Sequence, residues 1–368
     1  MDKVQEGEAD CFAPVEQKIT AKMDVFYNPL MKENRDITIL FLNAFFDKPF
    51  TAASIMAGTG IREVRLLKEV PNLSFVAIND GNPKAVELIK KNLDSNSILS
   101  EKYSLSNTEA SLFLLQNKSW DYIDVDPFGT PNPFLDAAIK KCKNRGIMGI
   151  TATDTAALAG TYPKATLRKY WAIPLRNYLM HEIGVRIFLR KIQLIAAHFE
   201  KAAIPVFSYS SQHYYRVFVQ IIDSKTETDK VLKQHGALYY CKNCMALSEK
   251  KCSEHENSLH VGPLWLGALW NKEITQKIAK ANKWKEHDLL LNTINEESSI
   301  EEMGFFDIHA FARSRHSSSL PKINEFIEAI KSKGYESART HFSLYGIRTK
   351  APIKEIEKIF IQCICGRQ

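Results

Sequence analysis

The sequence predicts an α/β protein built on a doubly wound parallel sheet. Short apolar runs suited to buried strands alternate with stretches that have the apolar spacing of helices, and a glycine turn follows the first run. Polar residues stand where the runs end. Parallel strands need a crossover connection, usually a helix, so this alternation indicates a sheet with its binding site at the carboxyl ends of the strands. Residues 43–46 are expected in a helix before the first strand.

The first expected strand ends in a glycine turn. Residues 51–56 precede Gly58 and Gly60, and residues 61–67 have the apolar spacing of a helix. Such a turn lets backbone N–H groups approach a nucleotide-like ligand, although a lone Gly-x-Gly is more often only a structural turn. The dinucleotide fingerprint requires a third glycine where this chain has Glu63, so NAD is disfavoured.

The second and third expected strands bring further polar groups to the same edge. Residues 75–78 form the second apolar run, which ends next to Asp80. This acid stands about twenty residues beyond the glycine turn, where such folds place a carboxylate on ribose hydroxyls. The third apolar stretch ends near Glu109 and Ala110, where a side chain could contact the edge of an adenine.

The fourth expected strand, residues 120–125, runs directly into Asp126, Pro127, Phe128 and Gly129. An aryl amine is a poor nucleophile until its hydrogen bonds are accepted, so the Asp126 carboxylate and the Pro127 carbonyl would polarise it toward an electrophilic methyl group. Phe128 would stack on the flat base. The alternative is a plain turn, since Asp and Gly favour turns and Pro fixes φ. The order of glycine turn, ribose acid and this motif favours an enzyme.

Five segments occur in one order over nearly the whole chain. They are residues 25–36, 126–129, 153–158, 262–267 and 334–342. Together they resemble the Trm1 family, whose members are tRNA guanine-N2 dimethyltransferases that use S-adenosylmethionine on the guanosine at tRNA position 26. The resemblance implies a Rossmann-like class I methyltransferase domain, S-adenosylmethionine as cofactor and tRNA as partner. It leaves the extent of methylation, mono or di, undetermined.

The resemblance also implies roles for residues around the cofactor. Arg35 matches the family arginine that pairs with the cofactor carboxylate, a task suited to its planar fork of donors. Arg62 matches an arginine that follows the glycine turn, and Arg65 competes with it for that role. Glu109 stands where the family more often has Asp.

The target base is expected between two aromatic rings. The resemblance implies that Phe26 helps Phe128 to sandwich the base. The alternative is that Phe26 and Tyr27 only fill the core at the N-terminus.

Two other functions stay open. One is methylation of the adenine amino group in DNA or another RNA, because related Asp-Pro-Pro-Tyr turns serve that chemistry; the Phe128-Gly129 ending argues against it. The other is a zinc-containing RNA-binding protein that has lost catalysis, since a fold alone never proves activity. The presence of Asp126, Asp80 and Arg35 together argues against this second function.

Four residues with metal-ligand spacing follow in the second half of the chain. Cys241-x-x-Cys244 and Cys252-x-x-His255 form two short knuckles, which favour a structural tetrahedral zinc site over free thiols. The resembled family often has a fourth Cys at His255, and His260 is near enough to be an alternative ligand. Such a closed site would stabilise a domain with little other core and leave no open position for catalysis.

A change of composition suggests two domains. The polar stretch 223–230 follows a long apolar run and marks the boundary. Residues 1–228 are expected to form the catalytic domain, with 146–151 as its fifth strand. Residues 229–368 are expected to form a smaller zinc-containing α+β domain that binds tRNA, with amphipathic helices such as 322–331.

Composition agrees with a polyanionic partner. The 368 residues contain 49 Lys and Arg against 42 Asp and Glu, which gives a net charge of +7. Two basic clusters are candidates for phosphate contacts or, equally, for solvated surface. These clusters are Lys140, Lys141, Lys143 and Arg145, and Arg313, Arg315 and His316.

The sequence also predicts the compartment. No run reaches the roughly 20 apolar residues that a membrane span needs, and the N-terminus lacks the basic start and apolar core of a signal peptide. The seven cysteines are an odd number, and four of them stand in close pairs, so a secreted disulfide framework is not expected. We expect a cytoplasmic protein with no membrane partner and no obligate protein partner evident.

Overall fold

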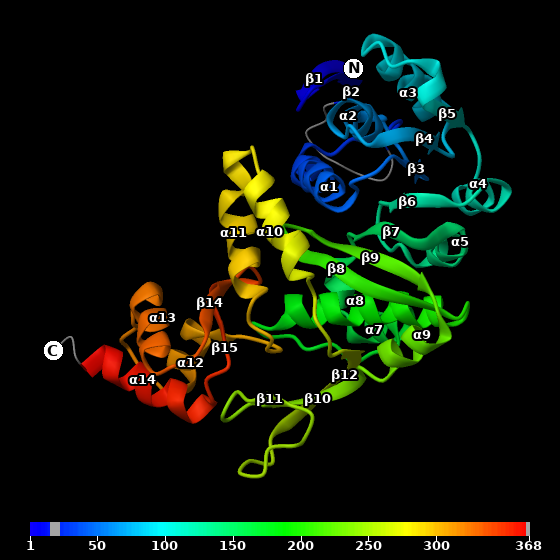
Figure 1. The fold of residues 1–368 in the computed structure, drawn as a ribbon. Coiled ribbons are helices and arrows are strands. Elements are labelled where there is room, and N and C mark those ends of the chain that lie inside the picture. The colour runs from blue at the N-terminus through cyan, green and yellow to red at the C-terminus, as the bar shows by residue number, and fades with distance from the viewer. Residues whose placement is uncertain (15–22, 366–368) are drawn as a thin grey trace.

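A computed structural model describes residues 1–14 and 23–365 of the chain, and its largest element is a seven-stranded sheet (Figure 1). In sheet order the strands are β5 (Tyr103–Ser106), β4 (Leu73–Asn79), β3 (Phe50–Ser54), β6 (Trp120–Val125), β7 (Cys142–Ala152), β9 (Tyr214–Asp223) and β8 (Lys201–Ser211). The first five are parallel to one another. β9 and β8 are added to β7 as an antiparallel hairpin.

The strand order confirms the predicted doubly wound sheet. In chain order, β3, β4 and β5 follow one another toward one edge of the sheet, and β6 and β7 lie on the other side of β3, so the order reverses between β3 and β6. In open α/β sheets this switch point is where ligands bind. The fifth expected strand, 146–151, lies within β7, and the apolar run before the polar stretch 223–230 is β9.

Helices cover both faces of this sheet, as Figure 1 shows. One face packs against α1 (Lys32–Phe45), α2 (Ile61–Glu69) and α3 (Pro83–Ser95). The other packs against α4 (Ala110–Gln116), α5 (Leu135–Lys141) and α8 (Met180–Ala197). Successive side chains of a strand point to opposite faces, so Tyr122 lies in the first core and its neighbour Ile123 in the second.

A short N-terminal hairpin closes over the first face. It consists of β1 (Asp2–Glu6) and β2 (Ala9–Ala13), which pair in antiparallel fashion. Asn92 on α3 accepts a hydrogen bond from the Phe12 N–H at 2.7 Å, and Asn96 accepts one from the Asp10 N–H at 3.0 Å. The hairpin thereby brings Glu6 to the buried face of α1.

Shorter elements connect and extend the sheet. They are η1 (Pro29–Met31), η2 (Ser100–Lys102), η3 (Asn132–Phe134), α6 (Thr155–Leu158), α7 (Pro163–Tyr170) and α9 (Lys225–Leu232).

The second half of the chain contains two small antiparallel sheets and several helices. The sheet β11-β10-β12 consists of β10 (His235–Cys241), β11 (Leu247–Ser248) and β12 (Ser258–Trp265). The sheet β13-β15-β14 consists of β13 (Phe306–Asp307), β14 (Ser337–Thr340) and β15 (Ser343–Thr349). The helical segments are α10 (Lys272–Ala281), η4 (Lys285–His287), α11 (Asp288–Glu297), α12 (Ile308–Ser314), α13 (Ile323–Ser332) and α14 (Ile353–Cys365).

Buried contacts join the two halves of the chain. Helix α10 packs beside α1 and α11 packs against α10 (Figure 1), and their residues Ile278 and Leu291 belong to the same core as α1. Arg348 on β15 is fully buried and forms ion pairs with Glu182 on α8 at 3.0 Å and with Glu297 on α11 at 3.1 Å. The division of the chain at residue 228 stays a prediction.

Within the part of the chain that the structure describes, no helix combines the length and the apolar character that crossing a bilayer requires.

Candidate active site

A cavity of about 560 Å³ lies where β3, β6 and β7 end, at the switch point of the sheet. Its volume is in the range of small-molecule and cofactor sites. Segments that are far apart in the sequence form its wall. These are residues 26–28, 30–31 and 35 near the N-terminus, 56–59 and 61–63 around the glycine turn, 126–129, 153–154 and 212–214.

The glycine turn lies on one side of the cavity. Gly58 and Gly60 have φ values of +57° and +75°, which favour glycine. A Cβ on Gly58 would stand 2.9 Å from the Phe26 carbonyl oxygen, so the close approach of these two segments also requires glycine. The Gly58 N–H donates to Asp80 Oδ2 at 2.8 Å. The predicted ribose acid is therefore fixed beside the turn, although it does not belong to the cavity lining.

The ends of β4 and β5 are held together by side-chain amides. Asn79 Nδ2 donates to the Thr108 carbonyl at 2.9 Å, and Asn79 Oδ1 accepts from the Thr108 N–H at 3.1 Å. Glu109 caps α4, because its Oε2 accepts from the Leu112 N–H at 2.8 Å. Backbone N–H groups of α4 lower the pKa of Glu109. Neither Glu109 nor Ala110 lines the cavity, so the predicted contact with adenine is outside this wall.

The Asp-Pro-Phe-Gly segment forms the opposite side. It is tied to the end of β7, because the Gly129 N–H donates to Thr153 Oγ1 at 2.6 Å and the Thr153 N–H donates to the Gly129 carbonyl at 3.0 Å. Phe128 is 61% exposed, and its ring meets Phe26 edge to face with centroids 5.6 Å apart. The structure brings the two predicted aromatic residues into contact, but their rings are not parallel and leave no gap between them for a base.

Arg62 contacts Asp126 through Nη2 and Oδ2. Its Nη1 donates to Asn34 Oδ1 at 3.0 Å and to Thr38 Oγ1 at 3.2 Å, so the guanidinium is fixed on several sides. The family resemblance predicts that Arg62 contacts the cofactor. In this structure it lines the cavity and supports Asp126.

A second layer of charge lies behind Arg62. Asp124 Oδ1 stands 3.6 Å from Arg62 Nε, and Asp124 Oδ2 accepts from Arg216 Nη2 at 2.7 Å. Burial opposes ionisation of Asp124, but Arg216 and Arg62 together hold its pKa below the ordinary value. The network alternates positive and negative groups from β9 to the cavity.

Arg35 lines the cavity near the N-terminal segment, and its guanidinium group binds Glu6 of the N-terminal hairpin. Arg35 Nε donates to Glu6 Oε2 at 2.7 Å, and Arg35 Nη2 also contacts the carbonyl of Asn28 at 3.3 Å. Tyr27 OH donates to the other oxygen of Glu6 at 2.9 Å. A cofactor carboxylate at Arg35 would have to share the guanidinium with Glu6.

Arg65, the other candidate of the sequence, points elsewhere. It is fully buried and binds Asp36 through Nη1 at 2.6 Å and Glu69 through Nε at 2.8 Å. It does not line the cavity. The ion pair with Asp36 joins α2 to α1, whereas Glu69 lies on α2 itself.

Sequence reasoning missed Glu63 as a site residue. This carboxyl lines the cavity and is 1% exposed. Oε1 accepts from Ser54 Oγ, whereas Oε2 has no hydrogen-bond partner among the described residues. Burial raises the pKa of Glu63 to about 7. In the sequence, Glu63 was notable only because it replaces the third glycine of the dinucleotide fingerprint, and we used that difference only to disfavour NAD.

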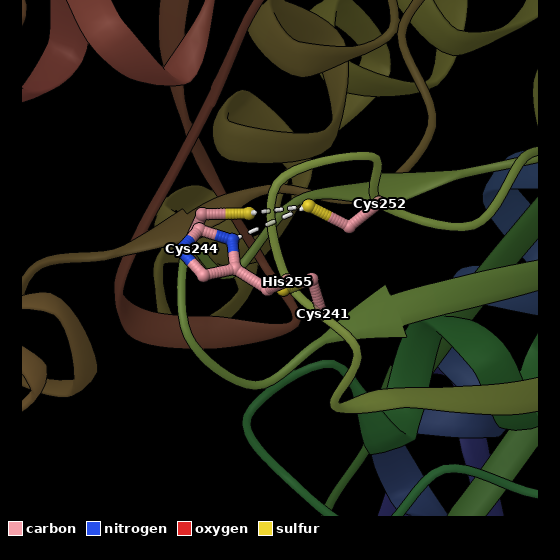
Figure 2. A group of neighbouring side chains, drawn as sticks. All are labelled: Cys241, Cys244, Cys252 and His255. Atoms are coloured by element: carbon pink, nitrogen blue, oxygen red, sulfur yellow. Dashed lines mark hydrogen bonds between the residues drawn. The ribbon is translucent and has the colours of Figure 1, made fainter.

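The four predicted metal ligands meet in the loops around β10 and β11, as Figure 2 shows. Cys244 Sγ lies 3.8 Å from Cys252 Sγ, and Cys252 Sγ lies 3.3 Å from His255 Nδ1. The ligand atoms of all four residues, Cys241 included, lie within 4.8 Å of one another, so the cluster could hold a metal ion. His260 lies outside this group, on β12, against the ring of Tyr239.

The two predicted basic clusters do not border the cavity. Lys143 lies near the start of β7, at the opposite end of the strand from the cavity, and pairs with Asp121 at 2.8 Å. Lys140 pairs with Asp136 at 3.3 Å. Arg315 pairs with Glu357 at 2.7 Å beside the metal-ligand cluster.

Comparison with known proteins places this site in a family. The family model described as N2,N2-dimethylguanosine tRNA methyltransferase matches residues 7–361. The chain belongs to this family.

Curated relatives match almost end to end. The tRNA (guanine(26)-N(2)/guanine(27)-N(2))-dimethyltransferase of Aquifex aeolicus is 37% identical, over 97% of this chain and 95% of the relative. The tRNA (guanine(26)-N(2))-dimethyltransferase of Pyrococcus furiosus is 36% identical, over 95% of this chain and 96% of the relative. These matches support neither the adenine methyltransferase nor the inactive RNA-binding protein.

A solved structure matches the whole fold. It is Trm1 from Pyrococcus horikoshii in complex with S-adenosyl-L-methionine, with a TM-score of 0.88 and 34% identity, over 98% of this chain and all of that chain. The resemblance expected from the sequence and the predicted fold class are thereby confirmed.

Proposed function

We propose that this chain methylates the exocyclic N2 of the guanosine at position 26 of tRNA with S-adenosylmethionine, giving N2-methyl- and then N2,N2-dimethylguanosine. The observation that carries the proposal is the meeting of Asp126 and Phe128 with the glycine turn around one cavity, in a chain that matches dimethyltransferases over nearly its full length. S-Adenosylmethionine is supported by the cofactor named for the matching solved structure.

The cavity fits such a cofactor. Gly58 and Gly60 have positive φ and no side chains, so the backbone of the turn is open to a ligand. Asp80 is anchored beside the turn, because its two carboxylate oxygens accept hydrogen bonds from the N–H groups of Gly58 and Asn82. Oε2 of Glu63, which has no hydrogen-bond partner among the described residues, adds a buried polar group to the same wall. We assign the nucleoside part to the turn and, beyond the lining of the cavity, to Asp80, Glu109 and Ala110.

The amino acid part of the cofactor carries a carboxylate and an ammonium group. We assign the carboxylate to Arg35, because its guanidinium lines the cavity and suits planar carboxylates. Glu6 then stabilises Arg35 from behind as its buried counter-charge.

The methyl acceptor is the amino group of guanine. When bound, S-adenosylmethionine supplies a methyl group on a positively charged sulfur, which suits in-line displacement by nitrogen. Asp126 and the Pro127 carbonyl accept the hydrogen bonds of the amino group and so raise its nucleophilicity. The new N–C bond would form as the S–C bond breaks, its electron pair staying on sulfur, which becomes a neutral thioether, and one amino proton would pass to the Asp126 carboxylate and on to water. Because a proton remains after the first transfer, a second transfer can follow.

Arg62 has a positioning role in this proposal. It binds Asp126 through Oδ2, and no described residue hydrogen-bonds to Oδ1. Oδ1 is therefore available to the guanine amino group while Oδ2 is held. Arg62 would thus orient Asp126, a role that differs from the cofactor contact expected from the sequence.

Phe26 and Phe128 would enclose the base. Their edge-to-face contact implies that Phe128 turns when guanine enters, and its exposure leaves it room to do so. A base inside folded tRNA cannot reach an in-line methyl donor, so the guanosine has to be extruded into the cavity.

We assign zinc to the cluster of Cys241, Cys244, Cys252 and His255. Three sulfurs and one imidazole nitrogen are a closed set for this ion, and the 3.8 Å between two sulfurs agrees with bonds of about 2.3 Å in a tetrahedron. With no position left for substrate, the ion would be structural.

A substrate swap tests the proposed function. Unmodified tRNA transcripts with guanosine or adenosine at position 26 are incubated with the protein and S-adenosylmethionine carrying a labelled methyl group. We expect label in the guanosine transcript and at most background in the adenosine transcript. Equal labelling of both transcripts would reject guanosine 26 as the target, and a guanosine 27 variant would then show whether the neighbouring nucleotide is used.

A further inference from the structure

A segment with basic but no acidic residues follows the end of β7. Residues 155–181 contain no Asp or Glu, whereas they include Lys164, Arg168, Lys169 and Arg176. All four are exposed in the structure. We call the exposed side chains of residues 161–176, on α7 and the loop after it, the α7 surface.

Large apolar side chains stand between these charges. Those exposed by 45% or more are Tyr162, Leu167, Trp171 and Ile173. Trp171 has a φ of +56°, and Lys191 Nζ lies 3.1 Å from its ring centroid. Exposed aromatic rings among unpaired cations are the combination that proteins use to bind RNA, because phosphates pair with the cations and unstacked bases pack on the rings.

The α7 surface is fixed to the rim of the cavity. Tyr170 OH donates to Asp154 Oδ1 at 2.6 Å and lies 3.2 Å from Thr130 Oγ1. Asn132 Nδ2 donates to the Lys169 carbonyl at 2.9 Å. Asp154 lines the cavity, and Thr130 follows the Asp-Pro-Phe-Gly segment directly. The segment that carries the α7 surface is therefore anchored beside the rim of the cavity.

Two of the cations are free for a partner. Among the described residues, none forms an ion pair or hydrogen bond with the side chain of Lys164 or Arg168, whereas Lys169 is paired with Asp154 at 3.1 Å. Lys164 and Arg168 are four residues apart on α7, so they lie on one side of the helix. Two free cations on one side of a helix can contact successive phosphates of one strand.

We propose that the α7 surface binds the tRNA backbone next to the extruded guanosine. Lys164 and Arg168 contact phosphates, and Tyr162 stacks on a base that loses its neighbour when the guanosine leaves the helix. The inference rests on the proposed function for the identity of the nucleic acid. It adds a tRNA contact in the first half of the chain to the one expected in residues 229–368.

A charge-reversal pair tests the phosphate contacts. The double variant Lys164→Glu/Arg168→Glu is compared with Lys48→Glu/Lys102→Glu, which makes the same change of net charge. Lys48 and Lys102 are exposed and stand just before β3 and β5, at the opposite end of the sheet from the cavity. The measurements are the Kd for tRNA at several salt concentrations, the Kd for S-adenosylmethionine and the thermal melt.

For the α7 double variant we expect a tRNA Kd at least about tenfold higher at 0.15 M salt, and a salt slope reduced by about two. Its melt and its cofactor Kd should match the wild type, and the control pair should change the tRNA Kd by less than about threefold. Equal weakening by both pairs, or no weakening by the α7 pair, would overturn the inference. Wild-type protein that binds tRNA but forms no methylated product would reject the proposed function and leave the binding comparison interpretable.

A second comparison tests stacking. Tyr162→Ala should raise the tRNA Kd at least about fivefold, because one stacked base is worth about 1–3 kcal/mol, whereas Tyr162→Phe keeps the ring and should stay near wild type. Equal affinities of the two variants would overturn the stacking role.

Discussion

Arg62 and Asp126 are joined in the cavity wall, with Arg62 Nη2 bound to Asp126 Oδ2. Arg62 lies on α2, which follows β3, and Asp126 follows the end of β6. The pair therefore spans the switch point between β3 and β6. The contact fixes one oxygen of the carboxylate, and no described residue hydrogen-bonds to the other.

Asp126→Asn should lower turnover by at least about a hundredfold, because an amide can accept a hydrogen bond but cannot take up the amino proton. The Kd values for tRNA and S-adenosylmethionine should change by less than about threefold. Single-turnover rates and equilibrium binding on the same preparation provide the comparison. Turnover within a few-fold of wild type would remove the catalytic role of Asp126.

Arg62→Lys should lower kcat more than it raises either KM, because a lysine keeps the charge but cannot hold Asp126, Asn34 and Thr38 at once. We expect a loss of about tenfold or more in kcat. The matched control is Arg145→Lys, at the opposite end of β7, which should be silent. A rise in the KM for S-adenosylmethionine with kcat unchanged would return Arg62 to a cofactor role.

Glu63→Gln should change the pH dependence of stability. The pKa of Glu63 is raised by burial from 4.5 to about 7, so the folded protein keeps this proton while the unfolded chain loses it. Wild-type stability therefore falls as the pH rises from 4.5 to 7, by up to about 3 kcal/mol for this group. In urea unfolding, the Gln variant should gain on the wild type between pH 5 and pH 8. A constant difference between the two proteins from pH 5 to pH 8 would contradict a raised pKa of Glu63.

Arg348→Met should lower the free energy of unfolding by about 3–5 kcal/mol, because it leaves the buried Glu182 and Glu297 carboxylates without their shared cation. Lys350→Met breaks an exposed ion pair with Glu336 in the same region and should leave the free energy of unfolding close to that of the wild type. Denaturant unfolding of both variants checks the difference. Similar small losses in both variants would show that the ion pairs of Arg348 with Glu182 and Glu297 do not stabilise the fold.

Metal analysis of the purified protein should find one zinc ion per chain. Cys252→Ser should lose the ion and lower the melting temperature, whereas Cys142→Ala, in the core of the sheet, should keep the ion whatever its effect on stability. A well-folded wild-type protein without metal would exclude a structural ion at this cluster.

The sequence predicted that the glycine turn and Asp126 lie at the same edge of the sheet, because parallel strands with crossover helices bring their carboxyl ends together. Both line the cavity, whereas Asp80 lies beside the turn outside the lining, and residues 212–214 of the wall were not predicted. Short Cys and His spacings likewise defined the metal-ligand cluster, because nearby ligands need little from the rest of the fold.

Side-chain partners were less accessible. Arg35 meets Glu6 only because the N-terminal hairpin packs on α3, and Arg62 turns to Asp126 rather than outward because Asn34, Thr38 and Asp124 surround it. These choices depend on tertiary packing between residues distant in the sequence. The family resemblance supplied roles for both arginines, but not the acids that they contact.

The most direct test of the central claim is the identity of the nucleoside formed at position 26. Unmodified tRNA is incubated with S-adenosylmethionine and either wild-type protein or Asp126→Asn, and the digested RNA is analysed by mass spectrometry. The account predicts N2-methyl- and N2,N2-dimethylguanosine with the wild type and neither nucleoside with the variant. N6-methyladenosine, or dimethylguanosine at equal rates from both proteins, would contradict it.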